Sequence, residues 1–227
     1  MKLIKLLKTN LVILVCLGVL TSSSAFAQDK EQKKIAAATT VISDFSKMKE
    51  SIPSELLAVT QGIIIVPKLI NAGLVVGGKR GKGIAMVKKA NGTWSNPVFV
   101  TITGGSVGAQ IGVQSVDLVL IFKHSNSLTE IKKSSFTLGG DLSIAAGPVG
   151  RNSTANTDYK LEAEVYSYSR SKGLFAGISL NGASLAIDAT ANTDFYGKEM
   201  SASTIFNSAS STAANVKELK ATLSAMK

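Results

Sequence analysis

The sequence predicts an α+β domain in which a curved, largely antiparallel sheet or partly closed barrel is flanked by N-terminal and C-terminal helices. Helical periodicity is confined to the two ends of the chain, and short β-branched runs fill the middle. These runs follow one another without the intervening helices that parallel sheets require. Glycines are dense inside them, and interior glycines permit bulges and strong curvature.

The first 27 residues have the features of a secretory signal peptide. Three lysines precede an uncharged apolar run over 11–20, and small residues follow it up to Ala27. A run of about ten residues is far short of the ~20 needed to span a bilayer, so we expect cleavage after Ala27. Cys16 lies inside the run rather than behind a small residue at its end, which disfavours a lipid-modified anchor. We therefore expect an exported protein, periplasmic or extracellular and peripheral to a membrane.

Composition limits what the remaining chain can be. It holds no cysteine, so neither a disulfide framework nor a thiolate site is available to it. The leader takes three of the 25 basic residues and none of the 15 acidic ones, which leaves a net charge of +7 and favours acidic partners. About 200 residues are ample for one domain. We expect that domain over 28–200, with a C-terminal amphipathic helix over 201–227 packed on it or appended to it.

Helical spacing is clearest near the start of the mature chain. Apolar residues recur at intervals of three and four from Ile35 to Met48, with charged residues between them. The pattern predicts an amphipathic helix over about 30–50. Pro53 suits the first turn of a second short helix, because its missing N–H would be unpaired there anyway, and this helix should cover about 53–60.

The middle of the chain is predicted to form consecutive strands. The first four are short β-branched runs separated by glycine, proline or asparagine, at 63–66, 74–76, 84–87 and 98–102. The run 116–122 is nearly all apolar, so it should lie centrally with both faces covered. Ser127 and Glu130 then have the spacing of a capping box, which predicts a short helix. Three further strands are expected at 158–169, 173–180 and 183–190.

The last part of the chain has a polar stretch over 199–211 and then a second helical pattern. Val216, Leu219, Leu223 and Met226 fall on one face of the predicted C-terminal helix.

The stretch GGKRGKGIAM, residues 77–86, combines three cations with four glycines. Gly78 and Gly83 have the separation found in a P-loop, but Ile84 stands where the loop requires lysine. No long helix follows to supply the aligned amides of a dinucleotide site. The stretch therefore predicts a hairpin between two strands and not a nucleotide-binding loop.

Such a hairpin would carry Lys79, Arg80 and Lys82 at its tip, and a basic tip suits anionic lipid headgroups. Each cation near a charged surface contributes ~1 kcal/mol, which gives only weak binding for so few residues. Membrane binding would therefore also need an apolar insertion, for which the helix over 30–50 is the obvious candidate. The alternatives are that this helix packs on the sheet and that the hairpin is a solvated loop.

One group of residues matches a catalytic pattern. Ser106 lies in a G-x-S-x-G match, and Asp117 and His124 follow in the order of a hydrolase triad. Strand-like sequence continues on both sides of Ser106, whereas a nucleophile elbow needs a strained turn between a strand and a helix. We therefore expect no enzyme activity and interpret Ser106 as a small residue on a curved strand.

Metal and nucleic-acid sites are also disfavoured by the sequence. His124 is the only histidine, and the carboxylates lack the spacing of a calcium loop or a zinc motif, so we expect neither metal nor cofactor. Glu162 and Glu164 would share one face of a strand, either as a coupled pair or, as we favour, on a solvated face. The aromatic residues are not interleaved with basic ones, which argues against nucleic acid.

A longer series of motifs resembles the SYLF domain family. The family pattern has Ile-Pro near its start, a Gly-Ile-x-Ile-x-Pro strand, a glycine-rich hairpin, Trp-Ser-x-Pro and Gly-x-Gln-Ile-Gly. These elements occur here in the same order, at residues 52–53, 62–67, 77–83, 94–97 and 108–112. The resemblance covers roughly residues 35–200.

The resemblance implies a non-enzymatic, lipid-binding domain, since eukaryotic members recognise phosphoinositides. They use an amphipathic, basic segment at the start of the domain, and the matching positions here are Lys33, Lys34, Lys47 and Lys49. A yeast member also binds actin, but actin is not expected as a partner in a bacterial envelope. Anionic phospholipid or lipopolysaccharide phosphates would be the equivalent target there. The alternative is a structural or protein-interaction module of the envelope without lipid specificity.

Overall fold

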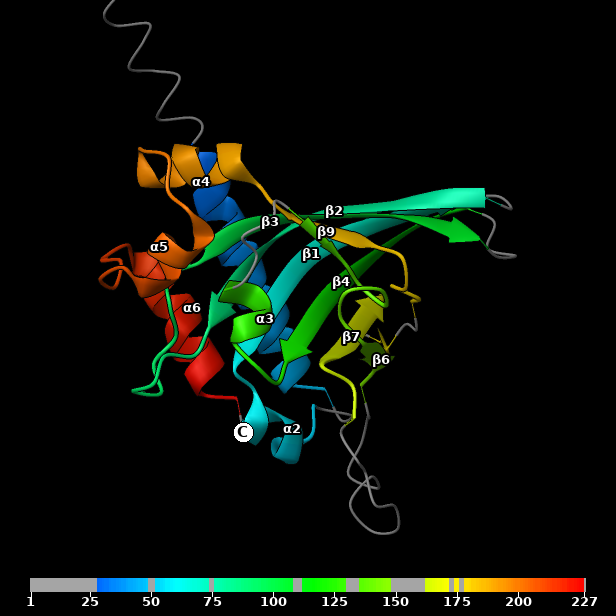
Figure 1. Ribbon diagram of the computed structural model, residues 1–227, viewed down its shortest axis with the longest axis horizontal. Helices are drawn as coiled ribbons and strands as arrows, with labels where there is room; N and C mark the ends of the chain where they lie inside the picture. Colours follow the sequence, from blue (N-terminus) through cyan, green and yellow to red (C-terminus); the bar gives the residue numbers. More distant parts are fainter. Residues whose placement is uncertain are drawn as a thin grey trace, which may run out of the picture.

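The fold, seen in a computed structural model, is organised by one sheet. The structure describes residues 28–48, 52–73, 76–107, 112–129, 135–147, 162–171, 174–175 and 178–226. Within these ranges nine strands have the order β5-β9-β3-β2-β1-β4-β7-β6, with β8 paired to β7. All pairings are antiparallel except that of β6 with β7. The predicted α+β fold with a curved, largely antiparallel sheet is confirmed (Figure 1).

Four long strands form the centre of the sheet and short strands extend it on both sides. The central strands are β1 (Gly62–Gly73), β2 (Val76–Val87), β3 (Val98–Val107) and β4 (Gly112–Phe122). The short strands are β5 (Ser135–Thr137), β6 (Ile144–Ala146), β7 (Val165–Ser171), β8 (Leu174–Phe175) and β9 (Ser184–Ile187). As its sequence predicted, β4 is central and is buried on both faces near its end.

A β-bulge bends β1 in its middle. The register with β4 shifts between Val66 and Leu69, and Lys68 has a positive φ of 53°. Pro67 cannot donate to a ladder, so a bulge is where a central strand can accommodate it. The N–H of Lys68 instead donates to Asp117 Oδ1 at 3.1 Å. The bulge thereby separates β1 into an apolar half and a half that projects beyond the helices.

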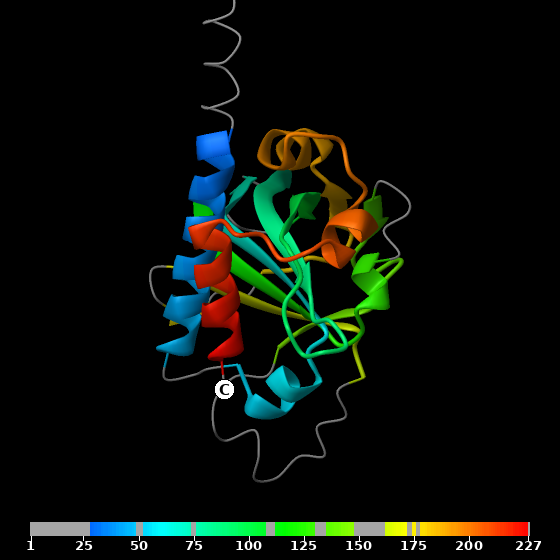
Figure 2. The ribbon, with the colours of Figure 1, turned by 90° about the vertical axis from the view of Figure 1, so that its left-hand side faces the viewer.

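Two helices cover one face of the sheet. The N-terminal helix, described over 28–46, lies beside α6 (Ala214–Ser224), and the two run in the same direction (Figure 2). The Asn215 side chain donates to the Gln32 carbonyl at 3.3 Å and so joins the starts of the two helices. The helical periods near the two ends of the chain are therefore confirmed as helices.

The apolar stripe of the N-terminal helix is buried against this face. Ile35, Ala38, Val41, Ile42 and Phe45 have exposed fractions of at most 3% and belong to one cluster with the odd-numbered isoleucines of β1 and with Val216, Leu219 and Leu223 of α6. In this fold the stripe packs on the sheet, which is the alternative to membrane insertion. No helix in the described ranges is both long and apolar enough to cross a bilayer.

The opposite face is covered by shorter elements. Leu128 of α3 (Asn126–Thr129) and Ile205 and Phe206 of α5 (Ala202–Asn207) pack on the side chains that alternate with those of the first face. Neither α5 nor β5 and β6 was predicted. Among the described residues of the strand expected at 173–180, Leu174–Phe175 form a strand and 178–180 do not. These elements are too short to show a repeating hydrophobic pattern in the sequence, and only the burial of a few apolar residues distinguishes them.

Two further helices close the ends of the sheet. The predicted second helix is α2 (Ser54–Val59), with Pro53 as its N-cap residue. The helix α4 (Ala189–Tyr196) replaces the end of the strand expected at 183–190. Asp188 caps it by accepting from the Ala191 N–H, and Gly197 ends it in the left-handed conformation. The side chain of Asn192 accepts from the Phe99 N–H at 2.9 Å and so ties α4 to β3.

Candidate functional site

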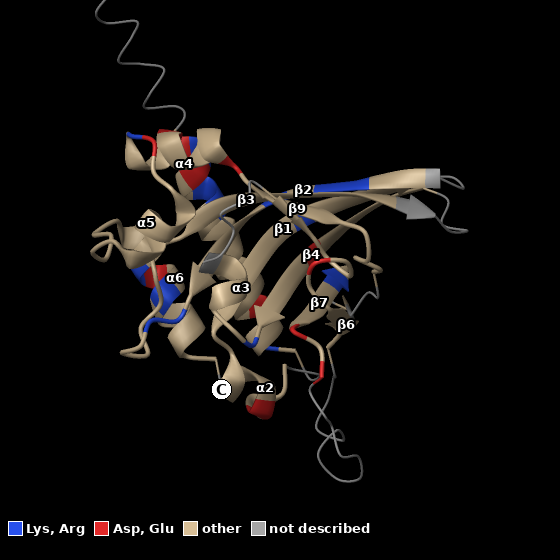
Figure 3. Cartoon of the chain, in the orientation of Figure 1, with Lys and Arg blue, Asp and Glu red and all other residues tan. Residues whose placement is uncertain are grey.

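The basic stretch lies within strand β2 and does not form a hairpin tip. The β1–β2 pairing extends to Gly73 and Gly77, so Lys79 lies opposite Asn71 and Arg80 opposite Ile70. The predicted hairpin crown of Lys79, Arg80 and Lys82 is therefore wrong. Figure 3 shows basic positions along β2 itself, on the part of the sheet beyond the helices. Because side chains alternate along a strand, the three cations cannot act as one cluster.

Lys79 points to the face opposite the N-terminal helix and is buried. Its exposed fraction is 7%, and its ammonium donates to the Ser179 carbonyl. Burial lowers the pKa of this lysine, since desolvation disfavours the charged form. Lys79 thus fixes the chain before β9 to the sheet and is not available to a headgroup in this conformation.

Lys82 is exposed on the other face but is paired. Its Nζ lies 2.7 Å from Asp188 Oδ2, and 42% of its side chain is exposed against 10% for Asp188. Burial alone would raise the pKa of Asp188, but the hydrogen bonds from Lys82 and the Ala191 N–H outweigh it and hold that pKa below its usual range. The pair joins β2 to the N-terminus of α4.

Arg80 has a guanidinium without a partner among the residues that the structure describes, and its side chain is exposed. Register places it beside Ile70 and Thr103, and places Ile70 beside Ser115. Val113 lies on the same face two residues further along β4 and is 76% exposed, and Ile70 is 42% exposed. These five residues form a surface that we call the open face. It continues the face covered by the N-terminal helix, beyond the end of that cover (Figure 1).

The cations of the N-terminal helix are only partly available. Lys33 is exposed but lies 2.6 Å from Asp29, and Lys34 lies 2.5 Å from the buried Glu31. Lys47 is exposed, and Lys49 lies outside the described residues. Of these cations, Lys33 and Lys47 are therefore exposed, whereas Lys34 lies over the Phe99 ring of the sheet at 5.6 Å from its centre and is largely buried.

An arginine holds the N-terminal helix to the sheet. Arg170 Nη2 lies 2.8 Å from Asp44 Oδ2 and 2.8 Å from Asp117 Oδ2, and its guanidinium stands 5.7 Å from the centre of the Phe45 ring. Asp44, which breaks the basic face of the helix in the sequence, is thus part of the contact that fastens it. This contact opposes release of the helix toward a membrane.

The hydrolase arrangement is not formed. Ser106 lies in β3 opposite Gly77, at the end of the sheet where β1 meets β2. His124 follows Phe122 at the other end, and its Nδ1 lies 2.7 Å from Glu164 Oε2. Asp117 is bound to Arg170 and His124 to Glu164, and Ser106 lies at the opposite end of the sheet from His124, so the three residues of the sequence match do not come together.

Glu164 is a structural carboxylate and does not form a pair with Glu162. Both precede β7, and Glu164 accepts from Ser127 Oγ at 2.6 Å as well as contacting His124. Burial would raise the pKa of Glu164, but these hydrogen bonds lower it overall. Ser127 therefore contacts Glu164 rather than capping α3, and Glu130 lies outside the described residues. No group of three metal-ligating side chains occurs in the described part of the chain.

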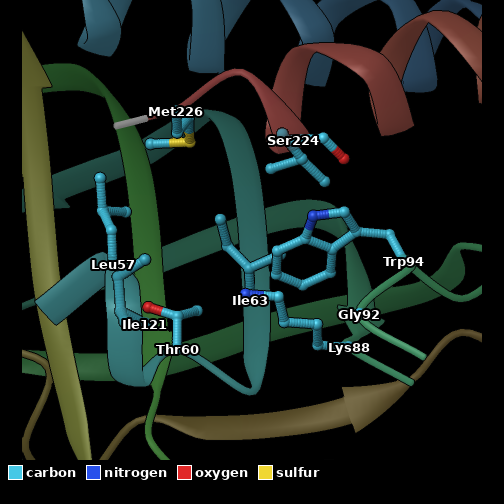
Figure 4. A pocket seen from close by; sticks show the side chains of 10 residues that line it. Leu57, Thr60, Ile63, Lys88, Gly92, Trp94, Ile121, Ser224 and Met226 are labelled. Atoms are coloured by element: carbon cyan, nitrogen blue, oxygen red, sulfur yellow. The ribbon is translucent and has the colours of Figure 1, made fainter. Parts of the chain in front are cut away.

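A pocket opens at the other end of the helix-covered face. It has a volume of about 280 Å³ and lies between α2, the segment after β2 and the C-terminal end of α6 (Figure 4). Its apolar lining comes from Leu57, Ile63, Trp94, Ile121, Leu223 and Met226, and Lys88 and Thr60 add polar groups. Sequence reasoning missed this pocket, although Trp94 as the only tryptophan was a possible signal.

These features define an α+β domain built on one curved antiparallel sheet, with an uncovered basic and aliphatic surface at one end and a pocket at the other. A model of the Ysc84 family, described as Las17-binding protein actin regulator, matches residues 103–226. The chain therefore belongs to this family, which is the SYLF family that its motifs resemble.

Curated relatives share most of the chain. SH3 domain-containing YSC84-like protein 1 of Xenopus laevis is 35% identical over 178 residues, which are 78% of this chain and 53% of the relative. The human protein of the same name is 34% identical over 181 residues, 79% and 53% of the two chains. LAS seventeen-binding protein 3 of Saccharomyces cerevisiae is 30% identical over 184 residues, 80% and 40%. The chain thus spans about half the length, or less, of these relatives.

Proposed function

We propose that this chain is an exported, non-enzymatic domain that binds anionic phospholipid or phosphate headgroups at a membrane surface. The observation that carries the proposal is the open face. There the guanidinium of Arg80, which has no partner among the described residues, stands beside the exposed aliphatic side chains of Ile70 and Val113. Arginine suits phosphate because its planar donors bind two oxygens at once. Membership of the SYLF family supports the same class of ligand.

The cations predicted from the sequence have different roles in this proposal. Arg80 is the primary headgroup ligand, and Lys82 contributes if it exchanges Asp188 for a phosphate. Lys33 and Lys47 add long-range attraction from the outer side of the N-terminal helix, as does Lys49 by its position in the sequence. Lys79 and Lys34 are largely buried and support the fold rather than the ligand.

The expected affinity is modest. Each cation near an anionic surface adds about 1 kcal/mol. Burying one aliphatic side chain completely adds about 1.5–3 kcal/mol. Two cations and the partial burial of Ile70 and Val113 give on the order of 5 kcal/mol, which corresponds to sub-millimolar binding. Binding of this strength is peripheral, reversible and sensitive to salt.

Vesicle flotation of the mature chain tests the proposal. We expect recovery with phosphatidylglycerol vesicles at low salt, less at high salt, and little with phosphatidylcholine. Arg80→Glu should abolish the difference between the two lipids. Lys217→Glu is the matched control, because it makes the same charge change at an exposed position of α6. Equal loss in both variants would reduce the effect to net charge and would contradict a site at Arg80.

The printed description of the family as an actin regulator favours a second candidate, a protein-interaction module. Actin co-sedimentation without lipid separates the two. Pelleting with filamentous actin that Arg80→Glu leaves unchanged, together with no anionic lipid preference, would support the second candidate and reject the first.

Export is a proposal of its own. The mature chain should begin at Gln28, and mass spectrometry of protein secreted by a bacterial host would detect that terminus. Retention of residues 1–27 in the exported protein would contradict cleavage after Ala27.

A further inference from the structure

We propose that the pocket beside Trp94 binds one hydrocarbon chain that ends in an anionic head, such as a medium-chain carboxylate. This ligand site lies at the opposite end of β1 and β2 from the open face, and the proposal does not depend on headgroup binding there. Ile63 pairs with Met86 and Ile121 where β1 begins and β2 and β4 end, whereas Arg80 lies towards the Gly73–Gly77 end of β1 and β2.

The apolar side of the pocket is built from both layers of the fold. Ile63 of β1 and Ile121 of β4 form its floor, and Leu223 of α6 forms a wall, all with exposed fractions of 4% or less. Leu57 and Met226 are only partly buried and stand at the rim. Methionine adapts to irregular apolar partners, so the rim can close on a flexible chain. Transfer of such a chain from water into this lining is favourable.

The polar side of the pocket has two donors without partners in the described ranges. Lys88 is half-buried, and Figure 4 shows its ammonium reaching in among Thr60, Ile63 and Trp94. The indole Nε1 of Trp94 lies on the edge of the ring that faces Ser224 (Figure 4). An ammonium that reaches into an apolar cavity is best complemented by a carboxylate or a phosphate, because hydrogen bonds between charged groups are stronger than those between neutral groups.

The neighbouring lysine shows that this arrangement is specific to Lys88. Lys89 points to the other face, where its Nζ donates to the Ser208 carbonyl at 3.0 Å. Two adjacent lysines thus have opposite environments: Lys89 is bound within the fold, and Lys88 faces the cavity with no partner in the part of the chain that the structure describes. This contrast supplies a matched control for the experiment.

Volume limits the ligand to one chain. Typical ligand pockets hold about 300–1,000 Å³, and this pocket, at about 280 Å³, lies at the lower limit. One medium-length chain therefore fits, whereas both chains of a phospholipid do not. The chain can come from a free fatty acid or from one acyl chain that leaves a membrane lipid. The two sources share the same chemistry and are separated by the experiment.

Trp94 provides the readout, since it is the only tryptophan in the sequence. We expect decanoate brominated on its chain to quench Trp94 fluorescence saturably below its micelle concentration, with calorimetry giving the same affinity. Lys88→Gln should weaken this binding about tenfold, whereas Lys89→Gln should leave it unchanged. Brominated decanol, which lacks the charge, should bind the wild type as weakly as brominated decanoate binds Lys88→Gln.

A second variant tests the cavity independently of charge. Ser224 lines the pocket and is exposed at the end of α6, so Ser224→Phe should fill the space without disturbing the core, and Ser224→Ala should not. We expect loss of saturable quenching only in Ser224→Phe, with circular dichroism unchanged in both. Equal quenching by decanoate and decanol, or binding unaffected by both Lys88→Gln and Ser224→Phe, would overturn the proposal.

The source of the chain is assigned with vesicles of chain-brominated phosphatidylglycerol, whose head is anionic. Quenching by these vesicles supports the pocket with a membrane lipid as donor, and quenching only by soluble decanoate supports it with a free fatty acid. Absence of saturable quenching by either source overturns it. Arg80→Glu should leave decanoate binding unchanged, so failure of headgroup binding and failure of this proposal are distinguishable.

Discussion

The two ends of the same four strands differ in what covers them. Near the start of β1, the sheet face that carries Ile63 and Met86 lies under the N-terminal helix and α6. Towards the Gly73–Gly77 pair, the same face carries Arg80 and Thr103 and is exposed. The strands extend beyond the helices that pack on them. Where the helices end, the residues on this face change from aliphatic to basic and polar. The covered end therefore contributes most of the buried apolar contacts, while the uncovered end leaves Arg80 and Ile70 accessible to solvent.

Glycine determines the shape of the strand that connects the two ends. A Cβ placed on Gly83 would lie 2.2 Å from the Ile65 carbonyl oxygen, and one on Gly81 would lie 2.5 Å from Val66 Cγ1. Only residues without a side chain allow β1 to approach β2 so closely at the bulge. The glycines of the basic stretch thus serve the curvature of the sheet and not a phosphate-binding loop.

Weakening the contact between the N-terminal helix and the sheet should have the largest effect on stability. Phe45→Ala deletes a ring that is 1% exposed and leaves a cavity under the N-terminal helix, so it should cost about 3–5 kcal/mol of unfolding free energy. Urea denaturation followed by circular dichroism measures it. Lys47→Ala, at the exposed residue that directly follows the same helix, should change stability by less than about 0.5 kcal/mol. A Phe45→Ala cost below 1 kcal/mol would mean that the helix is not fastened as described.

Loss of the ion pair between Lys82 and Asp188 should have an intermediate effect on stability. Asp188→Asn removes the charge that binds Lys82, although the amide can still cap α4, so the cost should be about 1 kcal/mol at neutral pH. The folded pKa of Asp188 is depressed, so its contribution is present above the unfolded value of about 3.9 and is lost as pH falls through the folded value. The difference between wild type and variant should therefore shrink below about pH 4. A difference that grows with acid would contradict the pairing.

Changes confined to the open face should have the smallest effect on stability. Ile70→Ser should alter the unfolding free energy by less than about 0.5 kcal/mol, yet weaken flotation with anionic vesicles several-fold, because an apolar contact with the lipid is lost. Val59→Ser is the control, since Val59 is also 42% exposed but lies on α2. Equal weakening in both variants would show that hydrophobicity in general, and not the open face, drives binding.

The sequence predicted most of the large elements and few of the small ones. Regular periods over many residues, as from Ile35 to Phe45 or from Val116 to Phe122, identify a helix and a central strand because burial recurs at each turn or pleat. The helix α4 has little apolar period, yet the cap at Asp188 and the glycine at 197 were readable signals. The glycines at 77–83 were interpreted as part of a hairpin turn. In the structure, Gly81 and Gly83 instead allow β1 and β2 to pack closely.

The sites depend on tertiary contacts that no local pattern contains. That Lys79 is buried and Lys82 is paired follows from Ser179 and Asp188, about a hundred residues away. The pocket likewise joins α2, Trp94 and α6 from distant parts of the chain. The basic composition of β2 was visible in the sequence, but which of its cations faces solvent was not. The assignment of headgroup binding to Arg80, Ile70 and Val113 therefore stands on the fold and stays a proposal.

Site-specific labelling tests the central claim most directly. Residues 28–227 contain no cysteine, so in a chain of these residues Val113→Cys and, as a control, Lys217→Cys each accept one environment-sensitive fluorophore such as NBD. With phosphatidylglycerol vesicles at low salt, the account predicts a blue shift and increased intensity for the label at 113 and no change at 217. A response at 217 with none at 113 would contradict it, because the membrane would then contact α6 and not the open face.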